Sequence, residues 1–260
     1  MASIELLAPA GDLVRAKVAL DFGADAVYIG GKRFSLRYRA SNFEVSDIAE
    51  AVEYAHARGK RIFVTVNMIP HQGDLVGLKE YLIELQSIGV DAVIVASLGI
   101  ASLVKQVAPQ MEVHLSTQLS ITNSESMRFY RELGVDRVVL ARELRLDTIE
   151  HIIEQAVLPV EVFIHGGMCV NYSGRCTLSN EMTLRDANRG GCAQSCRWSY
   201  DLHIAGEKVS PSTVPFSMGS KDLMALGSIE TMMKIGVTSL KIEGRMKSAY
   251  YIGVIVRAYR

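Results

Sequence analysis

The amino-acid sequence predicts an α/β protein, a (β/α)₈ barrel of the TIM type with a cysteine-bearing insertion after the seventh strand. A short apolar strand followed by an amphipathic helix recurs along the chain, which is typical of a parallel sheet covered by helices. The unit occurs eight times in 260 residues, and such barrels commonly have about 250. An open doubly wound sheet is the alternative, but no GxGxxG turn follows the first expected strand.

The expected strands are apolar almost throughout, as strands buried on both faces of a parallel sheet are. They cover residues 4–11, 25–31, 60–68, 91–97, 112–118, 136–142, 159–167 and 238–244.

Each expected strand leads to a helix, and five of these helices close at a glycine, the residue that most readily adopts the left-handed conformation ending a helix. These glycines are Gly23, Gly59, Gly89, Gly134 and Gly236. The helices are expected over residues 12–23, 45–59, 74–89, 98–109, 123–134, 145–157, 221–236 and 246–260.

The seventh unit is interrupted by about fifty residues, far more than the roughly 2–6 of an ordinary strand-to-helix loop. This insertion, 168–221, ends in a segment that predicts a hairpin turning at Ala205-Gly206. Residues 1–260 are thus expected to form one barrel with its insertion. Because the last expected helix has no stop signal, a further C-terminal domain is expected outside this sequence.

The bulk composition excludes several classes of protein. Equal numbers of acidic and basic residues, 28 of each, argue against a broadly basic nucleic-acid binder. The first residues lack the layout of a signal peptide, and no apolar run reaches the roughly 18–20 residues of a membrane span. A cytoplasmic protein without membrane association is expected, and there clustered cysteines indicate metal or redox chemistry rather than disulfides.

All four cysteines of the chain, Cys169, Cys176, Cys192 and Cys196, lie in the insertion with the spacing C-x6-C-x15-C-x3-C. Four thiolates complete the coordination of a [4Fe–4S] cluster or of a structural zinc ion. The last pair has the spacing of a zinc knuckle but the first pair does not, so the iron–sulfur cluster is favoured. Zinc and metal-free thiols remain alternatives.

The insertion is also rich in arginine, with Arg175, Arg185, Arg189 and Arg197 near the cysteines. These side chains would offset the charge of an anionic cluster or bind phosphate. A solvated charged loop is the alternative interpretation.

Barrel enzymes carry their working residues at the C-terminal ends of the strands. His165 precedes the cysteines and is a candidate proton shuttle, and Arg245 could clamp a carboxylate or phosphate. Each position also allows a purely structural role. The polar residues at the expected strand ends are Asn67, His114, Gln118, Arg142, Glu143, His165, Glu243 and Arg245.

The segment KRFSLRYRASNF, residues 32–43, interleaves basic and aromatic side chains, including Arg37. This mixture suits contacts to an RNA backbone and stacking on bases. A surface loop with aromatic anchors explains it equally well.

Residues 161–179 follow the pattern E-x-F-x-x-G-x-x-C-x-x-x-x-G-x-C-x-x-S, and the chain also contains ELLAPAGD, DAVYIGGKRFSLR, SKDL and LKIEGRMKSAYY. In these motifs the whole chain resembles the collagenase-like U32 peptidase family. Two departures are Gly167, where the pattern prefers Ser or Ala, and Ser97, where relatives often carry Asp.

The resemblance implies more than the family name states. Better understood relatives hydroxylate nucleosides in tRNA or ribosomal RNA, or support oxygen-independent quinone hydroxylation with a [4Fe–4S] cluster on cysteines of this kind. This chain looks most like the branch that converts tRNA uridine to 5-hydroxyuridine with prephenate, whose members have an additional C-terminal domain. Some relatives pair with one another, so a related protein subunit is a possible partner.

The function expected from residues and resemblance together is prephenate-dependent, oxygen-independent hydroxylation of tRNA uridine with an iron–sulfur cluster. Its implied partners are tRNA and a small carboxylate co-substrate. A peptidase and a non-catalytic, metal-stabilised scaffold are the alternatives. The expected catalytic residues are His165, His114, Glu243 and Arg245, the expected substrate-binding residues Arg37, Asn67, Gln118, Arg142 and Glu143, and the expected metal ligands the four cysteines.

Overall fold

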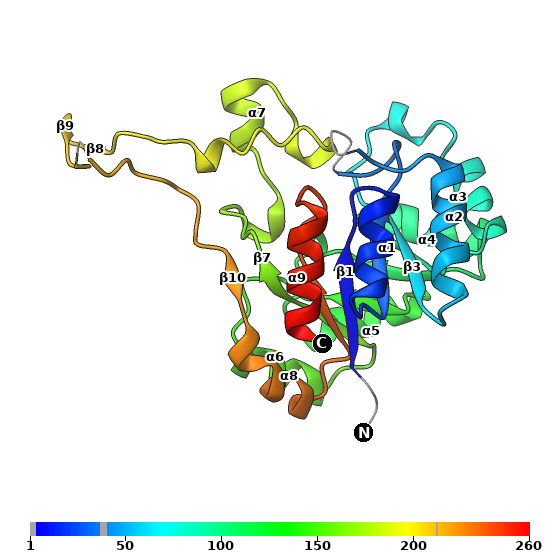
Figure 1. The fold of residues 1–260 in the computed structure, drawn as a ribbon. Helices are drawn as coiled ribbons and strands as arrows, with labels where there is room; N and C mark the ends of the chain where they lie inside the picture. The colour runs from blue at the N-terminus through cyan, green and yellow to red at the C-terminus, as the bar shows by residue number, and fades with distance from the viewer. Residues whose placement is uncertain (1–3, 37–40, 212) are drawn as a thin grey trace.

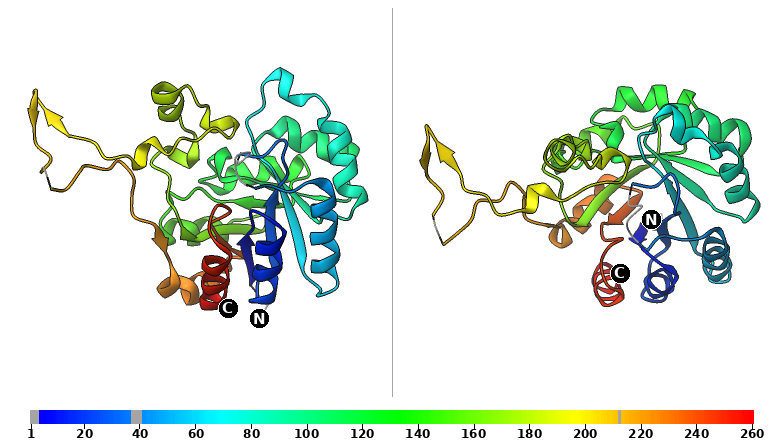
Figure 2. Two further views of the ribbon diagram at one scale, coloured as in Figure 1. Left: turned by 45° about the horizontal axis from the view of Figure 1, so that its top comes forward. Right: turned by 90° about the horizontal axis from the view of Figure 1, so that it is seen from above.

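The computed structural model describes residues 4–36, 41–211 and 213–260. Eight parallel strands close into a barrel, which confirms the predicted fold class (Figure 1). The strands follow one another around the barrel in chain order, and pairing of the sixth with the seventh and of the eighth with the first completes the ring. The view from above in Figure 2 shows the helices arranged around the outside.

The barrel strands are short and almost entirely buried, as expected for strands covered on both faces. They are β1 (Glu5–Pro9), β2 (Ala26–Gly30), β3 (Arg61–Val66), β4 (Ala92–Val95), β5 (Glu112–Leu115), β6 (Arg137–Val139), β7 (Val160–Gly166) and β11 (Ser239–Ile242).

The outer helices pack their apolar faces on the outward side chains of these strands. The five predicted helix-closing glycines all have positive φ, between 65° and 114°, which confirms their role. The helices are α1 (Leu13–Asp21), α2 (Val45–His56), α3 (Leu78–Ser87), α4 (Leu98–Val107), α5 (Ser124–Glu132), α6 (Leu146–Glu154), α8 (Ile229–Ile235) and α9 (Ala249–Tyr259). Within the described ranges, no helix has the length and apolar character needed to cross a bilayer.

The helix expected from residue 221 begins later than predicted, at Ile229. Its expected first residues instead form β10 (Leu223–Met224), antiparallel to the end of β7, and a 3₁₀ turn, η6 (Leu226–Ser228). Strand β6 pairs with β7 only at Val160 and Glu161, so the far half of β7 has an open edge on that side. Strand β10 covers this edge, and pairing of its backbone groups outweighs the helical pattern.

The insertion lies over the C-terminal ends of the strands, and its hairpin extends away from the barrel (Figures 1 and 2). The predicted hairpin is confirmed, because β8 (His203–Ile204) pairs with β9 (Glu207–Lys208). Both turn residues, Ala205 and Gly206, have positive φ, as a two-residue hairpin turn requires. The remaining short elements are η3 (Tyr172–Gly174), α7 (Leu178–Thr183), η4 (Ala187–Arg189) and η5 (Ser195–Arg197) in the insertion, and η1 (Gln72–Leu75) and η2 (Thr117–Leu119) elsewhere.

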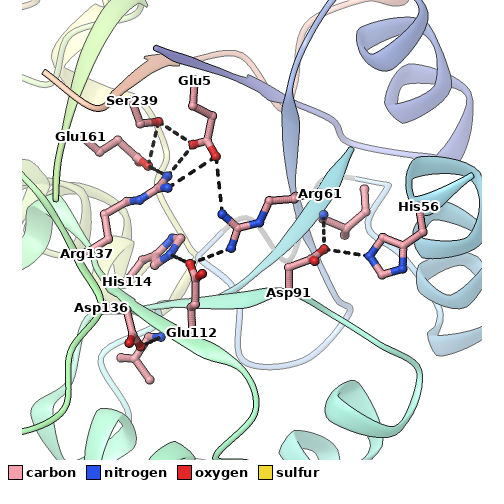
Figure 3. Close-up of polar contacts among 12 residues, drawn as sticks. Glu5, His56, Arg61, Asp91, Glu112, His114, Asp136, Arg137, Glu161 and Ser239 are labelled. Atoms are coloured by element: carbon pink, nitrogen blue, oxygen red, sulfur yellow. Dashed lines mark hydrogen bonds and ion pairs between the residues drawn. The ribbon is translucent and has the colours of Figure 1, made fainter. Parts of the chain in front are cut away.

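The N-terminal end of the barrel interior is filled by charged side chains rather than by an apolar layer (Figure 3). Glu161 has no exposed surface, and its carboxylate accepts hydrogen bonds from Lys241 Nζ at 2.6 Å and Arg137 Nη1 at 3.2 Å. Arg137 also pairs with Glu5, and Ser239 Oγ donates to both carboxylates. Burial alone would raise the pKa of Glu161, but Lys241 and Arg137 outweigh it and hold that pKa below its ordinary value.

The network continues toward solvent through Glu112, which accepts from His114 Nε2 at 2.9 Å and pairs with Arg61 at 2.7 Å. The hydrogen bond from His114, together with Arg61, lowers the pKa of Glu112 to about 2. Complete burial lowers the pKa of His114. The folded protein therefore favours charged Glu112 and neutral His114.

Acid should destabilise the fold through both groups. As the pH falls below 6.5, the ordinary pKa of histidine, the unfolded chain binds a proton at His114 more readily than the folded protein does. Between pH 4.5 and about pH 2 the same holds for Glu112. Each of these protonations therefore favours the unfolded chain. We expect the urea midpoint to fall as pH drops through these windows. The Glu112→Gln variant should lose less stability than wild type between pH 5 and pH 3. Parallel pH profiles for the two proteins would contradict this assignment.

Candidate functional site

A cavity of about 170 Å³ opens at the C-terminal end of the barrel, between the strand ends and the insertion. The ends of β3, β5, β6, β7 and β11 contribute side chains from below, and the insertion covers them from above. Ten of the residues singled out from the sequence line this one cavity. They are Asn67, Gln118, Arg142, Glu143, Glu243, Arg245, Cys169, Cys176, Cys192 and Cys196.

The four cysteines are free thiols, and they face the same cavity from three separate parts of the insertion. Cys176 is buried, Cys192 and Cys196 are half-buried and Cys169 is exposed. Burial raises the pKa of Cys196, and the nearby sulfurs of Cys169, Cys192 and Cys176 raise it further. The other three sulfurs therefore lie within electrostatic range of Cys196.

Local hydrogen bonds orient the buried thiol. Asn171 Nδ2 lies 3.2 Å from Cys176 Sγ, and the backbone N–H of Ser179 points to the same sulfur at 3.5 Å. Donors of this kind stabilise a thiolate and tune a metal group bound to it. Ser179 is held in turn, because its hydroxyl donates to the carbonyl of Arg185 at 2.9 Å.

The chemistry of the donor set fits a group that takes several thiolates. Within the described ranges, no three His, Cys, Asp or Glu side chains are grouped around a point suited to one metal ion. A tetrahedral zinc draws four sulfurs to about 2.3 Å from one centre. A [4Fe–4S] cluster binds each thiolate at a different iron, so its ligands stand further apart around a larger group. All four thiols line one cavity, which supplies the number and type of donors that such a group takes.

The arginines of the insertion bond to its own backbone and to the barrel. Arg175 Nε donates to the carbonyl of Gln118 at 2.6 Å, and Arg185 donates to the carbonyls of Gly191 and Cys192 at 3.1 Å. Arg189 pairs with Asp74 at 2.6 Å, and Arg197 donates to the carbonyl of Met168 and lies 3.5 Å from Asp222. These contacts tie the cysteine-bearing loops to each other and to the barrel.

Lys241 forms part of the cavity floor, and sequence reasoning missed it. Its ammonium group bonds to Glu161 and lies 4.6 Å from the ring centroid of Tyr28 and 5.3 Å from that of Phe163. The alternation of residues along a strand could have revealed it, because Ser239 and Lys241 are two residues apart in β11 and therefore share one face.

Arg245 is buried and reaches across the barrel to β2 and β3. Its Nη1 donates to Ser35 Oγ and Thr65 Oγ1, both at 2.9 Å. A Cβ atom at Gly30 would lie 1.9 Å from this nitrogen, so only glycine admits the side chain here. Arg245 lines the cavity.

The residues after β6 join the barrel to the insertion. Arg142 Nη1 donates to the carbonyl of Gly167 at 2.8 Å, and its guanidinium lies 3.7 Å from the ring centroid of Phe163. Glu143 accepts the backbone N–H of Ser173 at 2.6 Å. Both side chains line the cavity, so they position the insertion as well as the site.

The two histidines do not lie where the sequence predicted. His114 is completely buried in the charged layer near the N-terminal end, and its ring packs edge-on against Phe63. His165 contacts Tyr251 and Tyr259 of α9, and its Nδ1 lies 3.2 Å from the Tyr259 hydroxyl. Burial lowers the pKa of His165. Neither histidine lines the cavity: His114 lies deeper in the barrel than predicted, and His165, although at the C-terminal end of β7, faces α9.

The predicted RNA-contacting segment is described only in part, because Arg37 and residues 38–40 lie outside the described residues. In the part described, Phe34 and Phe43 are buried in the core. The guanidinium of Arg33 lies 4.7 Å from the Phe34 ring centroid, and Lys32 pairs with Glu44. These two aromatic residues are anchors of the loop, and the expectation that they stack on bases is wrong.

Comparisons with known proteins agree with this architecture. The chain is 48% identical to tRNA hydroxylation protein P1 of Bacillus subtilis, over 98% of this chain and 62% of that protein. It is 43% identical to the 23S rRNA 5-hydroxycytidine C2501 synthase of Escherichia coli, over 99% of this chain and 39% of that protein. The chain thus spans less than two thirds of these relatives.

The fold has a counterpart of known structure. A structure described as a U32 peptidase superposes with a TM-score of 0.64 at 10% identity, covering 95% of this chain and 96% of its own. The profile of "Peptidase family U32" matches residues 11–260, which include every barrel strand after β1, the insertion and all four cysteines. The chain therefore belongs to peptidase family U32.

Proposed function

We propose that this chain is the barrel domain of a cytoplasmic enzyme that hydroxylates uridine in tRNA to 5-hydroxyuridine. The observation that carries the proposal is the meeting of four thiols with a polar, partly cationic cavity at the barrel mouth. The similarity to a protein named for tRNA hydroxylation supplies the substrate class. Because the target atom of a base is hidden in a stacked helix, an unpaired uridine has to enter this cavity.

When water supplies the oxygen, hydroxylation at C5 replaces a C–H bond by a C–O bond and releases two electrons and two protons, so the reaction requires an external two-electron acceptor. We propose that the four cysteines hold a [4Fe–4S] cluster, which when bound supplies one-electron chemistry. Arg197 and Arg185 fix the loops that carry these ligands. Asn171 keeps the buried sulfur of Cys176 oriented.

The other residues of the cavity bind and orient the substrates. Arg142 and Arg245 place guanidinium groups at its wall, which suits the carboxylates of a small co-substrate such as prephenate. Lys241 places an ammonium group at its floor. We assign contact with the base to the uncharged polar side chains, Asn67 and Gln118.

A peptidase is the alternative that the family name suggests. A cysteine peptidase requires a thiol and an imidazole within hydrogen-bond reach. In the described part of the chain, no histidine lines the cavity that holds the thiols. This geometry favours the hydroxylase.

The test is a deletion strain complemented with the complete gene product. We expect 5-hydroxyuridine and nucleosides derived from it to disappear from digested tRNA on deletion and to return on complementation, as measured by mass spectrometry. Unrelated modified nucleosides serve as the internal control. Normal 5-hydroxyuridine in the deletion strain would overturn the proposal.

A further inference from the structure

The carboxamide of Gln118 has a fixed orientation, which a chain of hydrogen bonds starting from the backbone determines. The N–H of Leu36 can only donate, so the atom 3.2 Å from it is the oxygen of Asn67. The nitrogen of Asn67 therefore faces Gln118 and donates to its Oε1 at 3.3 Å. Ser116 Oγ donates to the same oxygen at 3.1 Å.

The remaining half of the amide is a donor without a protein acceptor. Gln118 is 4% exposed and lines the cavity. Its Nε2 is buried and has no hydrogen-bond partner among the described residues. Two hydroxyls of residues that line the same cavity, Ser173 Oγ and Ser195 Oγ, are also buried and have no hydrogen-bond partner among the described residues. A buried donor left unpaired is costly, so this group of atoms is built to meet a ligand.

The three groups differ in what they select. A hydroxyl rotates and either donates or accepts, so Ser173 and Ser195 accommodate both kinds of partner. The amide nitrogen of Gln118 donates only, and Asn67, itself oriented by the Leu36 N–H, prevents the amide from turning over. Gln118 therefore donates a hydrogen bond to a ligand oxygen at this point and disfavours a ligand amino group.

We propose that Gln118 selects uracil over cytosine by donating a hydrogen bond from Nε2 to the ring oxygen O4. This inference rests on the proposed function. Uracil carries a carbonyl at position 4, where cytosine carries an amino group, and this position adjoins the C5 atom that is hydroxylated. With cytosine two donors face each other, and both remain unpaired in a buried site.

The inference is tested with the complete protein in the deletion strain, by quantifying 5-hydroxyuridine products and 5-hydroxycytidine in tRNA. Gln118→Glu keeps the shape of the side chain and replaces the donor by an acceptor. We expect it to lower the uridine products at least about tenfold. Gln106→Glu makes the same chemical change on the exposed face of α4 and should leave them unchanged.

A second variant reverses the polarity without altering Gln118. Asn67→Asp presents an acceptor to the amide, which then turns its nitrogen toward this carboxylate and its oxygen toward the cavity. We expect the ratio of 5-hydroxycytidine to 5-hydroxyuridine to rise in this variant. If wild type restores 5-hydroxyuridine and both variants match it in amount and ratio, the inference is overturned while the proposed function stands. If wild type restores none, the proposed function itself fails.

Discussion

Replacing Glu161 by leucine should lower the free energy of unfolding by about 3–5 kcal/mol, because it leaves buried Lys241 without its counter-charge. Leucine is close in volume to glutamate, so little of the loss would come from a cavity. Arg137 keeps Glu5 as a partner, which limits the damage to the Lys241 side of the network. Urea unfolding should show a lower midpoint with an unchanged slope.

A matched control lies on the surface of α8. Glu230 pairs with Lys234 at 2.6 Å, but both side chains are more than 70% exposed. Glu230→Ala should change stability by less than about 0.5 kcal/mol, since exposed pairs contribute little. A loss in Glu161→Leu no larger than this would contradict the role assigned to the buried carboxylate.

The double variant Glu161→Leu with Lys241→Met separates the two contributions of Lys241. Removing both charges leaves no buried ion without a partner, so stability should recover by at least half of the loss. Hydroxylation should not recover, because the ammonium at the cavity floor is gone. Recovery of both would assign Lys241 a structural role alone.

The fold could be predicted from the sequence because its signals are local. Most residues of buried parallel strands are apolar, and glycines such as Gly89 and Gly134 close helices in a conformation that other residues avoid. The exception, β10, depends on a distant partner. Nothing within residues 221–228 reveals that β7 has an open edge there, so the local sequence predicts a helix from residue 221 although the helix begins at Ile229.

The site was predicted in part for a similar reason. Strand ends lie at one face of a barrel, so Asn67, Gln118 and Arg245 could be placed together. His165 could not, because the register of β7 against β11 shifts between Lys241 and Ile242. Phe163 pairs with Lys241 and His165 with Ile242, so one extra residue of β7 turns His165 toward α9.

The burial of His114 could not be predicted either, because it also depends on a residue that is distant in the sequence. Its position near the end of a strand was visible, but the depth of its side chain depends on Glu112 of the same strand and, through Glu112, on Arg61 of β3, two strands away. Lys241, in contrast, lines the cavity although the sequence did not single it out. A lysine in an apolar strand could pass for an edge residue until Glu161 is seen facing it inside the barrel.

Replacing Cys176 by serine is expected to have the largest effect on the proposed cofactor. Its sulfur belongs to the one buried cysteine of the four and receives two hydrogen bonds, so its position is fixed by the surrounding loops. A serine hydroxyl is a poor ligand for iron in place of a thiolate. Anaerobically purified complete protein should contain about four irons with equal sulfide. Cys176→Ser should retain less than about half of that iron, lose the visible absorption of the cluster, and fail to restore 5-hydroxyuridine.

Met233→Ser is a suitable control, because it removes an exposed sulfur on α8 far from the cavity lining. It should keep the iron content, the absorption and the activity of wild type. One zinc and no iron in the wild-type protein would replace the cluster by a structural metal and overturn the proposal that the four cysteines hold a redox group. Iron content unchanged by Cys176→Ser would move the ligand set to the other three cysteines and leave the buried thiol a packing role. Because iron and sulfide are measured on the purified protein, either result is independent of whether the variant acts on tRNA.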